Sequence, residues 1–370
     1  MSEKMVREKI AKTILNLADA METGSFQEKP LIGIAVSETE HGLDNIREGV
    51  RIAESRGFRA VIIDGEDAHK HMEEMLESGE IQGAVTMHYP FPIGVSTIGR
   101  VVTPGRGREM FLAATTGTSA TERVEAMVRN AIYGIVAAKA CGISKPTIGI
   151  ANIDGARQTE KILKKLAEQG YEISFAESAR ADGGVVMRGN DLLEGTADVM
   201  VMDALTGNLM MKIFSAYTTG GQFESLGFGY GPGVGENYHK TILIVSRASG
   251  APVIAGAIQY ATELLSGDFY KISDDEFQKT YQAGLKELLS ELKTEKNENK
   301  DKKVAVPPKE TVTHEIHGIE VVDLEDAAAS LWEKEIYAET GMGCTGPVIL
   351  VNESKAAFAR EVLKEKGYIA

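Results

Sequence analysis

Cys344 is the residue best suited to covalent chemistry. It is one of two cysteines, and it lies in the glycine-rich segment GMGCTG (341–346). Glycines leave main-chain N–H groups open, so the amides of Gly343, Cys344 and Thr345 could stabilise a thiolate or the oxyanion of an acyl-transfer intermediate. The same spacing is also consistent with a small cysteine buried at a tight turn. Cys141 follows a long helical pattern, and we expect it to be a buried residue at a helix end.

The segment also matches G-x-G-x-x-G, the fingerprint of dinucleotide-binding loops. That fingerprint lies between a strand and a helix, and an acidic residue follows further along the chain. Here we predict a helix before the glycines and a strand, PVILV (347–351), after them. No acidic residue ends a second strand at the required distance. The order of elements argues against a nicotinamide or flavin site, and we expect no bound cofactor.

Two turns carry groups that could bind an anion. The first, DALTGN (203–208), follows the apolar segment 197–203, and functional residues of open α/β sheets gather where strands end. Thr206 and Asn208 offer hydrogen bonds, and Gly207 would let the main chain approach a ligand. An ordinary strand-to-helix turn with Asn208 as the helix N-cap explains the same residues equally well.

The second turn, SRASG (246–250), also lies between a predicted strand and a predicted helix. Ser246, Arg247 and Ser249 beside a helix N-terminus would make a phosphate site. A capped helix start with a surface arginine is the alternative. Both turns would project from the same edge of a parallel sheet, which favours a shared anion site.

Three further residues could contact an anion. Thr116 and Thr118 precede the helical pattern at 120–141, although the sequence SATE (119–122) also matches a capping box that would explain this segment. Arg100 supplies positive charge in an acidic chain, and a solvated loop position is its simpler explanation. We therefore regard these three as possible anion contacts only.

These turns need a scaffold that brings strand ends together. Strand-like apolar segments alternate with helical patterns, as in a parallel sheet with crossover helices. We predict strands at 30–37, 58–64, 81–87, 146–152, 197–203 and 240–246. We predict helices at 4–22, 42–56, 66–78, 120–141, 156–169, 251–265 and 274–293. The glycine-rich segment 227–235 is predicted to be a lid or interface loop.

The C-terminal part is expected to follow a linker. Residues 293–311 are charged and nearly free of apolar side chains, which is typical of a linker or a long exposed loop. Beyond it we predict a strand at 319–323, a helix at 324–340, the strand at 347–351 and a final helix at 354–367.

Composition limits the classes of function. The formal net charge of −14 argues against nucleic acid as a partner, because phosphate backbones need a basic surface. The sequence has no continuous apolar run of about 18 residues and no signal-peptide core, so we expect a cytoplasmic protein without a membrane partner. Two widely separated cysteines favour a reducing compartment. His314 and His317 lack further ligands, so we expect no metal site.

With these motifs, the chain resembles the alpha subunit of component C of the glycine (sarcosine/betaine) reductase complex. That subunit is similar to phosphate acyltransferases and, more distantly, to phosphotransacetylases. Segment 197–212 (ADVMVMDALTGNLMMK) resembles the family's strand, acidic residue and T-G-N turn, and segment 245–261 resembles its hydroxyl-rich turn and helix. The tail TGMGCTGPVILV (340–351) is the most specific part, because general phosphate acyltransferases lack it.

The resemblance implies an α/β protein with a two-lobed, phosphotransacetylase-like (isocitrate/isopropylmalate dehydrogenase-like) fold and parallel-rich sheets. We place one lobe at residues 1–145 plus 246–290 and the second lobe at 146–245. A charged linker at 291–313 would then lead to a C-terminal α/β tail at 314–370 that carries Cys344.

The resemblance also implies a reaction. Component A, a selenoprotein, delivers a carboxymethyl group, component C forms an acetyl thioester on Cys344, and inorganic phosphate then releases acetyl phosphate. The phosphate would lie against the two turns, and main-chain amides of Gly343 and Thr345 would hold the oxyanion. The expected partners are phosphate, component A and the beta subunit of component C, in an oligomer.

Two questions stay open on the sequence alone. The segment around Cys344 contains no group that would lower the pKa of its thiol, and His88, His239 and Arg247 are equal candidates. A stand-alone phosphate acyltransferase that uses acyl-coenzyme A or acyl carrier protein is an alternative function. A non-catalytic scaffold subunit is a second alternative.

Overall fold

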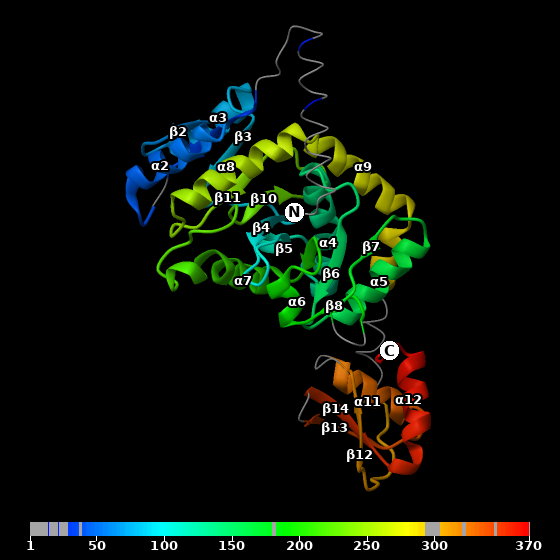
Figure 1. The fold of residues 1–370 in the computed structure, drawn as a ribbon. Helices are drawn as coiled ribbons and strands as arrows, with labels where there is room; N and C mark the ends of the chain where they lie inside the picture. The colour runs from blue at the N-terminus through cyan, green and yellow to red at the C-terminus, as the bar shows by residue number, and fades with distance from the viewer. Residues whose placement is uncertain are drawn as a thin grey trace. The chain divides into compact units, whose positions relative to one another are not determined.

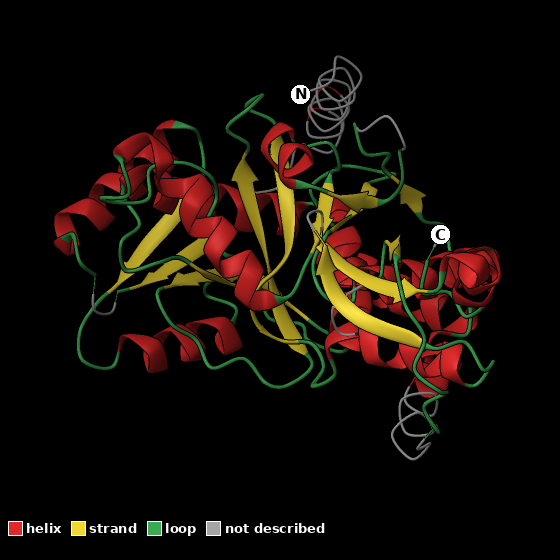
Figure 2. Ribbon diagram, turned by 90° about the horizontal axis from the view of Figure 1, so that it is seen from below, coloured by secondary structure: helices red, strands yellow, loops and turns green. Residues whose placement is uncertain are grey.

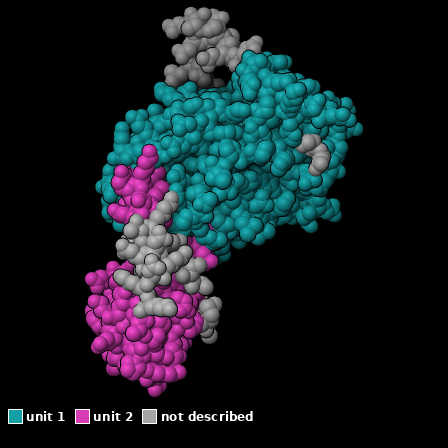
Figure 3. Space-filling model, turned by 180° about the vertical axis from the view of Figure 1, so that it is seen from behind, with its two compact units in different colours: residues 1–152, 163–283 teal, residues 153–162, 284–370 magenta. Residues whose placement is uncertain are grey.

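The structure, a computed structural model, describes residues 29–36, 39–179, 183–292, 304–319, 323–343 and 346–369, together with positions 14 and 21 (Figure 1). The chain divides into a larger unit, residues 1–152 and 163–283, and a smaller unit, residues 153–162 and 284–370 (Figure 3). The helix predicted at 4–22 and residues 293–303 of the predicted linker lie outside the described residues. The boundaries of the predicted lobes, linker and tail stay predictions.

One long sheet runs through the larger unit, with the strand order β2-β1-β3-β11-β10-β4-β5-β9-β6-β7 and β8 beside β6. Strand pairs are parallel at both ends of the sheet and antiparallel from β11 through β10 and β4 to β5. The strands are β1 (Leu31–Ala35), β2 (Arg59–Ile63), β3 (Gly83–Thr86), β4 (Val95–Val102), β5 (Glu109–Thr118), β6 (Thr147–Ala151), β7 (Ser174–Phe175), β8 (Val186–Met187), β9 (Val199–Val201), β10 (Gly231–Val234) and β11 (Ile242–Ile244). The expected α/β class with a mostly parallel sheet is confirmed.

All six strands predicted in this unit are present, whereas the central strands β4, β5 and β10 were not predicted. Strand β4 is buried at seven consecutive positions, so its sequence lacks the alternation that marks a half-exposed strand. Strand β10 consists of the residues Gly-Pro-Gly-Val, a composition more typical of loops. Apolar periodicity therefore could not predict the antiparallel centre of the sheet.

Helices flank the sheet (Figure 2). They are α2 (Gly42–Ser55), α3 (Ala68–Ser78), α4 (Arg123–Ala140), α6 (Gly189–Glu194), α7 (Ala204–Ala216), α8 (Ala251–Ser266) and α9 (Phe269–Gln282). Helix α5 (Ala156–Glu168) is divided between the two units after Ile162. Helix α8 packs on β3 and α2, α4 packs on β5 and β9, and α7 packs on β4 and β5. Within the described ranges, no helix combines the length and the apolarity needed to cross a membrane.

Helix α4 is buried on nearly all sides, and its start differs from the expectation. Its N-cap is Glu122, whose carboxylate accepts a hydrogen bond from the amide of Glu125 at 2.7 Å. The predicted capping box with Ser119 as N-cap is wrong, because the Ser119 hydroxyl instead hydrogen-bonds the Asn130 side chain at 2.7 Å. At the other end, Cys141 is the C-cap and is buried, as predicted.

The glycine-rich segment 227–235 is not a lid. Residues 230 to 235 are buried, and Gly231–Val234 form strand β10 inside the sheet. A Cβ atom on Gly231 would lie 1.6 Å from the carbonyl oxygen of Ile98, and this residue has a φ of +91°. Glycine is needed here because the main chain touches the neighbouring strand β4.

The smaller unit holds a second, antiparallel sheet with the order β12-β14-β13, and two helices. Its elements are β12 (His314–His317), α11 (Leu324–Trp332), β13 (Ala338–Gly343), β14 (Gly346–Val351), the short 3-10 helix η3 (Glu353–Lys355) and α12 (Ala356–Glu365). Apolar residues such as Ile316, Leu331, Ile349 and Leu363 form its core. The predicted strand at 347–351 and the last helix are confirmed.

One prediction for the smaller unit is wrong. The helix predicted at 324–340 ends at Trp332, because Glu335 has a φ of +57° and the chain then enters strand β13. The indole of Trp332 donates to the carbonyl oxygen of Ala338 at 3.1 Å and stabilises this change of direction. Strand β12, at 314–317, pairs with β14 on its other side. Residues 320–322 of the strand expected at 319–323 lie outside the described residues.

A buried ion cluster joins α9 to α4 in the larger unit. Glu276 on α9 is 2% exposed and accepts hydrogen bonds from Tyr171 at 2.8 Å and Lys279 at 2.7 Å, and it forms an ion pair with Lys139 of α4 at 2.9 Å. Burial opposes ionisation of Glu276, but these donors outweigh it and lower the pKa of the carboxyl below its ordinary value. The cluster therefore stabilises the fold when Glu276 is charged.

We expect Glu276→Gln to lower the free energy of unfolding by about 1–3 kcal/mol at pH 7, since it leaves Lys139 without its charged partner. Because the folded-state pKa of Glu276 is depressed, its contribution is present above the ordinary carboxyl pKa and is lost as pH falls through the folded-state pKa. Urea unfolding from pH 7 to pH 3 should therefore show the difference between variant and wild type shrinking. Glu172→Gln, at an exposed pair with Lys145, is the control without a large effect. A difference that is constant with pH would contradict the prediction.

Candidate functional site

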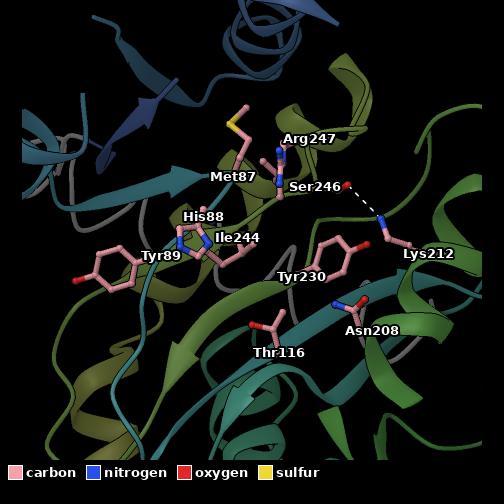
Figure 4. Close-up of a pocket in the computed structure, with 11 residues that line it drawn as sticks. Met87, His88, Tyr89, Thr116, Asn208, Lys212, Tyr230, Ile244, Ser246 and Arg247 are labelled. Carbon is pink, nitrogen blue, oxygen red and sulfur yellow. Dashed lines mark hydrogen bonds between the residues drawn. The ribbon is translucent and has the colours of Figure 1, made fainter. Parts of the chain in front are cut away.

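A cavity of about 260 Å³ lies in the larger unit beyond the ends of strands β3 and β11 (Figure 4). The start of α7, strand β5 and the residue before β10 complete its wall. The lining residues are Met87, His88, Tyr89, Thr116, Asn208, Lys212, Tyr230, Ile244, Val245, Ser246 and Arg247. These include two cations, Lys212 and Arg247, and no carboxylate. The chain is acidic overall, yet this cavity is suited to a small anion.

Lys212 and Ser246 come from distant segments and meet at the cavity. The ammonium of Lys212 on α7 donates to the hydroxyl of Ser246 at 3.3 Å, as the dashed line in Figure 4 shows. Asn208 lies one helical turn before Lys212, so both side chains project from the same face of α7. The amide group of Asn208 donates to the main-chain oxygen of Thr115 at 3.2 Å, which fixes its orientation at the cavity wall.

The turn after β11 divides its predicted ligands into two kinds. Ser246 and Arg247 line the cavity, as expected for anion ligands. Ser249 does not line it, since its hydroxyl accepts from the amide of Ser246 at 3.0 Å and holds the turn. The first amide of α8, that of Ala251, donates to the side chain of Asn45 at 2.8 Å. That amide is therefore already engaged, which weakens the expected use of this helix N-terminus for phosphate.

The turn before α7 shows a similar division. The N-cap is Asp203, whose carboxylate accepts from the amide of Thr206 at 3.0 Å and from its hydroxyl at 2.7 Å. Asn208 is therefore not the N-cap that the alternative explanation proposed, and it is one turn inside the helix. Thr206 completes the cap and does not line the cavity. Gly207 faces β5, where a Cβ atom would lie 1.7 Å from the oxygen of Ala114.

The three weaker candidates separate as well. Thr116 lines the cavity, whereas Thr118 is exposed at the end of β5 and is absent from the lining. Arg100 is 2% exposed and forms ion pairs with Glu109 at 2.5 Å and Glu263 at 2.6 Å. The geometry of Arg100 thus corrects the expectation of a solvated loop arginine, and it gives no support to an anion contact at this cavity.

Lys212 and Tyr230 were not predicted as site residues. Lys212 follows Asn208 by four positions, a spacing that places both on one face of a helix, but no helix was predicted over these residues. Tyr230 lies in the segment predicted to be a loop, so its approach to the cavity depends on strand β10. Burial and the nearby Glu224 carboxylate raise the pKa of Tyr230, whose hydroxyl donates to Glu224 at 2.8 Å. Tyr230 therefore stays protonated and cannot act as a base near neutral pH.

The histidine candidates are now distinguished by position. His88 lines the cavity, together with Arg247. His239 belongs to a different surface, where its ring contacts the Asp274 carboxylate at 2.8 Å. Within the described ranges, no group of three or more histidine, cysteine or acidic side chains has the arrangement of a metal site.

Cys344 and Thr345 lie outside the described residues, but their flanking strands correct the expected context. Strand β13, and not a helix, ends at Gly343, and Gly343 pairs with Gly346 at the start of the antiparallel strand β14. A dinucleotide fingerprint needs a helix after its glycines, and here a strand follows. The conclusion against a dinucleotide loop is unchanged, although one of its two premises was wrong.

Comparison with known proteins identifies the family. A family model described as "Fatty acid synthesis protein" matches residues 41–350. The chain is also 55% identical, over 99% of both sequences, to the glycine/sarcosine/betaine reductase complex component C subunit alpha of Peptoclostridium acidaminophilum. The chain therefore belongs to the family of component C alpha subunits. The resemblance inferred from the T-G-N turn, the hydroxyl-rich turn and the cysteine-bearing tail is confirmed.

More distant relatives of this component C family member cover only part of it. A phosphate acyltransferase of Lysinibacillus sphaericus is 37% identical over 31% of the chain and 34% of the relative. A phosphate acyltransferase of Bacillus licheniformis is 26% identical over 52% of the chain and 63% of the relative. A branched-chain phosphotransacylase from Enterococcus faecalis aligns in structure with 64% of this chain and 99% of its own, at 13% identity and a TM-score of 0.44.

We expect Gly207→Ala to destabilise the protein by about 1–3 kcal/mol or more, because the added methyl group would overlap the main chain of β5. Gly189→Ala is the matched control, since Gly189 begins helix α6 and a Cβ atom there would meet open space. Urea unfolding of both variants measures the difference. Equal stabilities for the two variants would show that the α7–β5 approach is not as tight as described.

Proposed function

We propose that this chain is the acyl-transfer subunit of a glycine reductase complex. In this proposal, Cys344 takes the two-carbon unit of the carboxymethyl selenoprotein as an acetyl thioester. The carbon–selenium bond breaks, one carboxyl oxygen leaves as water, and the selenium is oxidised to a selenide–sulfide with a second thiol. Inorganic phosphate then takes the acetyl group as acetyl phosphate. The observation that carries the proposal is a cavity of about 260 Å³ whose lining holds two cations, several hydroxyl groups and the amide of Asn208 but no carboxylate. The chain that forms this cavity is 55% identical to a component C alpha subunit.

Phosphate would bind between Lys212 and Arg247, with Thr116, Asn208 and Ser246 as hydrogen-bond partners. Charge-assisted hydrogen bonds to phosphate oxygens are shorter and roughly twice as strong as neutral ones. Two cations also match the charge of hydrogen phosphate near neutral pH. Thr206, Gly207 and Ser249, which were expected to contact phosphate, would instead hold the two turns in place.

The proposed transfer step balances without an added reactant. One oxygen of hydrogen phosphate attacks the carbonyl carbon of the thioester, and a tetrahedral oxyanion forms that the amides of Gly343 and Thr345 would stabilise. The carbon–sulfur bond then breaks, and the electron pair leaves on the sulfur of Cys344. The proton of phosphate passes to the thiolate, so that the products are acetyl phosphate and the free thiol.

The proposal also includes protein partners. We propose that the chain works with a beta subunit of component C and with selenoprotein component A, because the relative is named as one subunit of a complex. An exposed apolar stripe on α7 supports an assembled state. It is formed by Leu205, Leu209, Ile213 and, just after the helix, Tyr217, which are 45–80% exposed.

We expect Lys212→Met to raise the KM for phosphate about 10- to 100-fold, since a hydrogen bond to a charged group contributes about 1.5–3 kcal/mol. Arsenate-dependent hydrolysis of acetyl phosphate, with arsenate varied against phosphate, measures the effect. Lys145→Met removes an exposed lysine away from the cavity and should leave the KM unchanged. An unchanged KM in Lys212→Met would contradict the phosphate site.

We expect Cys344→Ser to reduce arsenate-dependent hydrolysis of acetyl phosphate by about 10³-fold or more, because the serine hydroxyl is a far weaker nucleophile and leaving group. Cys141→Ser is the matched control, since Cys141 is a buried helix-end residue in the larger unit. Labelled iodoacetamide should modify Cys344 in the wild type, and acetyl phosphate should protect it.

Full activity of Cys344→Ser would exclude the thioester role. Phosphate-dependent release of coenzyme A from acetyl-coenzyme A by that variant would instead favour a stand-alone phosphate acyltransferase. Unchanged kinetics of both Lys212→Met and Cys344→Ser, assayed in the complex with its partner subunits, would point to a scaffold whose partner carries out the chemistry.

A further inference from the structure

Glu224 contacts residues of this cavity and is not one of its lining residues. It is 2% exposed, and its carboxylate contacts three side chains that belong to the cavity or to its turns. One oxygen accepts from the Tyr230 hydroxyl at 2.8 Å and lies 3.5 Å from the Lys212 ammonium. The other oxygen accepts from the Ser249 hydroxyl at 2.7 Å. A single buried carboxylate thus connects the segments that carry Tyr230, Lys212 and Ser249.

The main chain of Glu224 is held as firmly as its side chain. Its amide donates to the carbonyl oxygen of Ala248 at 3.0 Å, and its carbonyl oxygen accepts from the amide of Gly250 at 2.8 Å. Both partners belong to the turn that carries Ser246 and Arg247. The carboxylate therefore has a defined position relative to that turn.

Ser249 transmits the effect of Glu224 to the cavity wall. Its hydroxyl donates to Glu224 and accepts from the amide of Ser246 at 3.0 Å. Loss of the acceptor on Glu224 would release the Ser249 hydroxyl and, with it, the amide of Ser246. The orientation of the cavity-lining Ser246–Arg247 segment depends on this relay.

Glu224 also restricts the position of the Lys212 side chain. Its side chain is 53% exposed, and a lysine in that position would otherwise sample many rotamers. Contacts with Glu224 and Ser246 hold the ammonium at the cavity before any ligand arrives. The lysine then loses less conformational entropy when an anion binds.

We propose that Glu224 is a positioning residue for phosphate, which acts through Lys212 and through Ser249 without touching the substrate. This inference rests on the proposed phosphate site. In this role the Glu224 carboxylate contributes to phosphate binding, in addition to stabilising the fold. Glu276 on α9 is a second buried carboxylate, and it contacts a tyrosine and two lysines. None of these residues lines the cavity, so Glu276 serves as a comparison for Glu224.

The test compares Glu224→Gln with Glu276→Gln in the full-length chain, assayed in the complex with its partner subunits. Both variants replace a buried carboxylate by a neutral group of the same shape, so both should lower thermal stability by similar amounts. Glu224→Gln should also raise the KM for phosphate about 10-fold, the loss of one charge-assisted interaction, and leave the KM for the acyl donor unchanged. Glu276→Gln should change neither KM.

A double-mutant cycle decides whether Glu224 acts through Lys212. If it does, the effects of Glu224→Gln and Lys212→Met on the phosphate KM should be less than additive, because without the lysine only the route through Ser249 remains. Fully additive effects would overturn this part of the proposal. Glu224→Asp, which keeps the charge but shortens the side chain, should give a KM between those of the wild type and Glu224→Gln.

A measurement without turnover separates this inference from the proposed function. The lysines of the full-length chain are reductively ¹³C-methylated, and the NMR signal of Lys212 is assigned with Lys212→Arg. The signal should shift in Glu224→Gln and stay in place in Glu276→Gln. An unchanged Lys212 signal together with an unchanged phosphate KM would overturn the positioning role. Failure of the wild type to bind phosphate in calorimetry would overturn the proposed function, and the Lys212 signal would still decide whether Glu224 holds the lysine.

Discussion

The close approach of main-chain segments at strand β5 is the constraint on which the cavity depends. Helix α7 lies so near this strand that position 207 has no room for a Cβ atom beside the oxygen of Ala114. Thr115, the next residue on β5, accepts from Asn208 of α7 through its carbonyl oxygen and donates from its hydroxyl to the carbonyl oxygen of Tyr230 at 2.6 Å. One short stretch of β5 therefore fixes the positions of the cavity-lining residues Asn208 and Tyr230.

Electrostatic organisation follows from this packing. The chain carries a formal net charge of −14, yet the described lining of the cavity holds cations and hydrogen-bond donors without a carboxylate. The buried carboxylate of Glu224 is outside the lining and contacts Tyr230, Ser249 and Lys212. Burial strengthens these interactions because the local dielectric constant is low. An acidic protein can thus present a small site that attracts anions.

Much of the fold was accessible from local patterns. Six of the strands in the larger unit and most of its helices follow from apolar periodicity, since each element buries one stripe or one short run. The elements that were missed or misplaced lack such a pattern. Strand β4 is buried on both faces, β10 is built of glycine and proline, and Glu335 ends α11 through a left-handed backbone conformation that its residue type does not announce.

The sequence by itself determined the family, the α/β class and the two turns that approach the cavity, because turn chemistry and motif spacing are local properties. It also singled out Cys344, through the glycines around it. Only the tertiary structure decided which turn residues line the cavity and which hold the turns: Asn208, Ser246 and Arg247 belong to the first group, and Thr206 and Ser249 to the second. Lys212 and Glu224 acquire their roles through contacts between segments far apart in sequence, and no local pattern encodes such contacts.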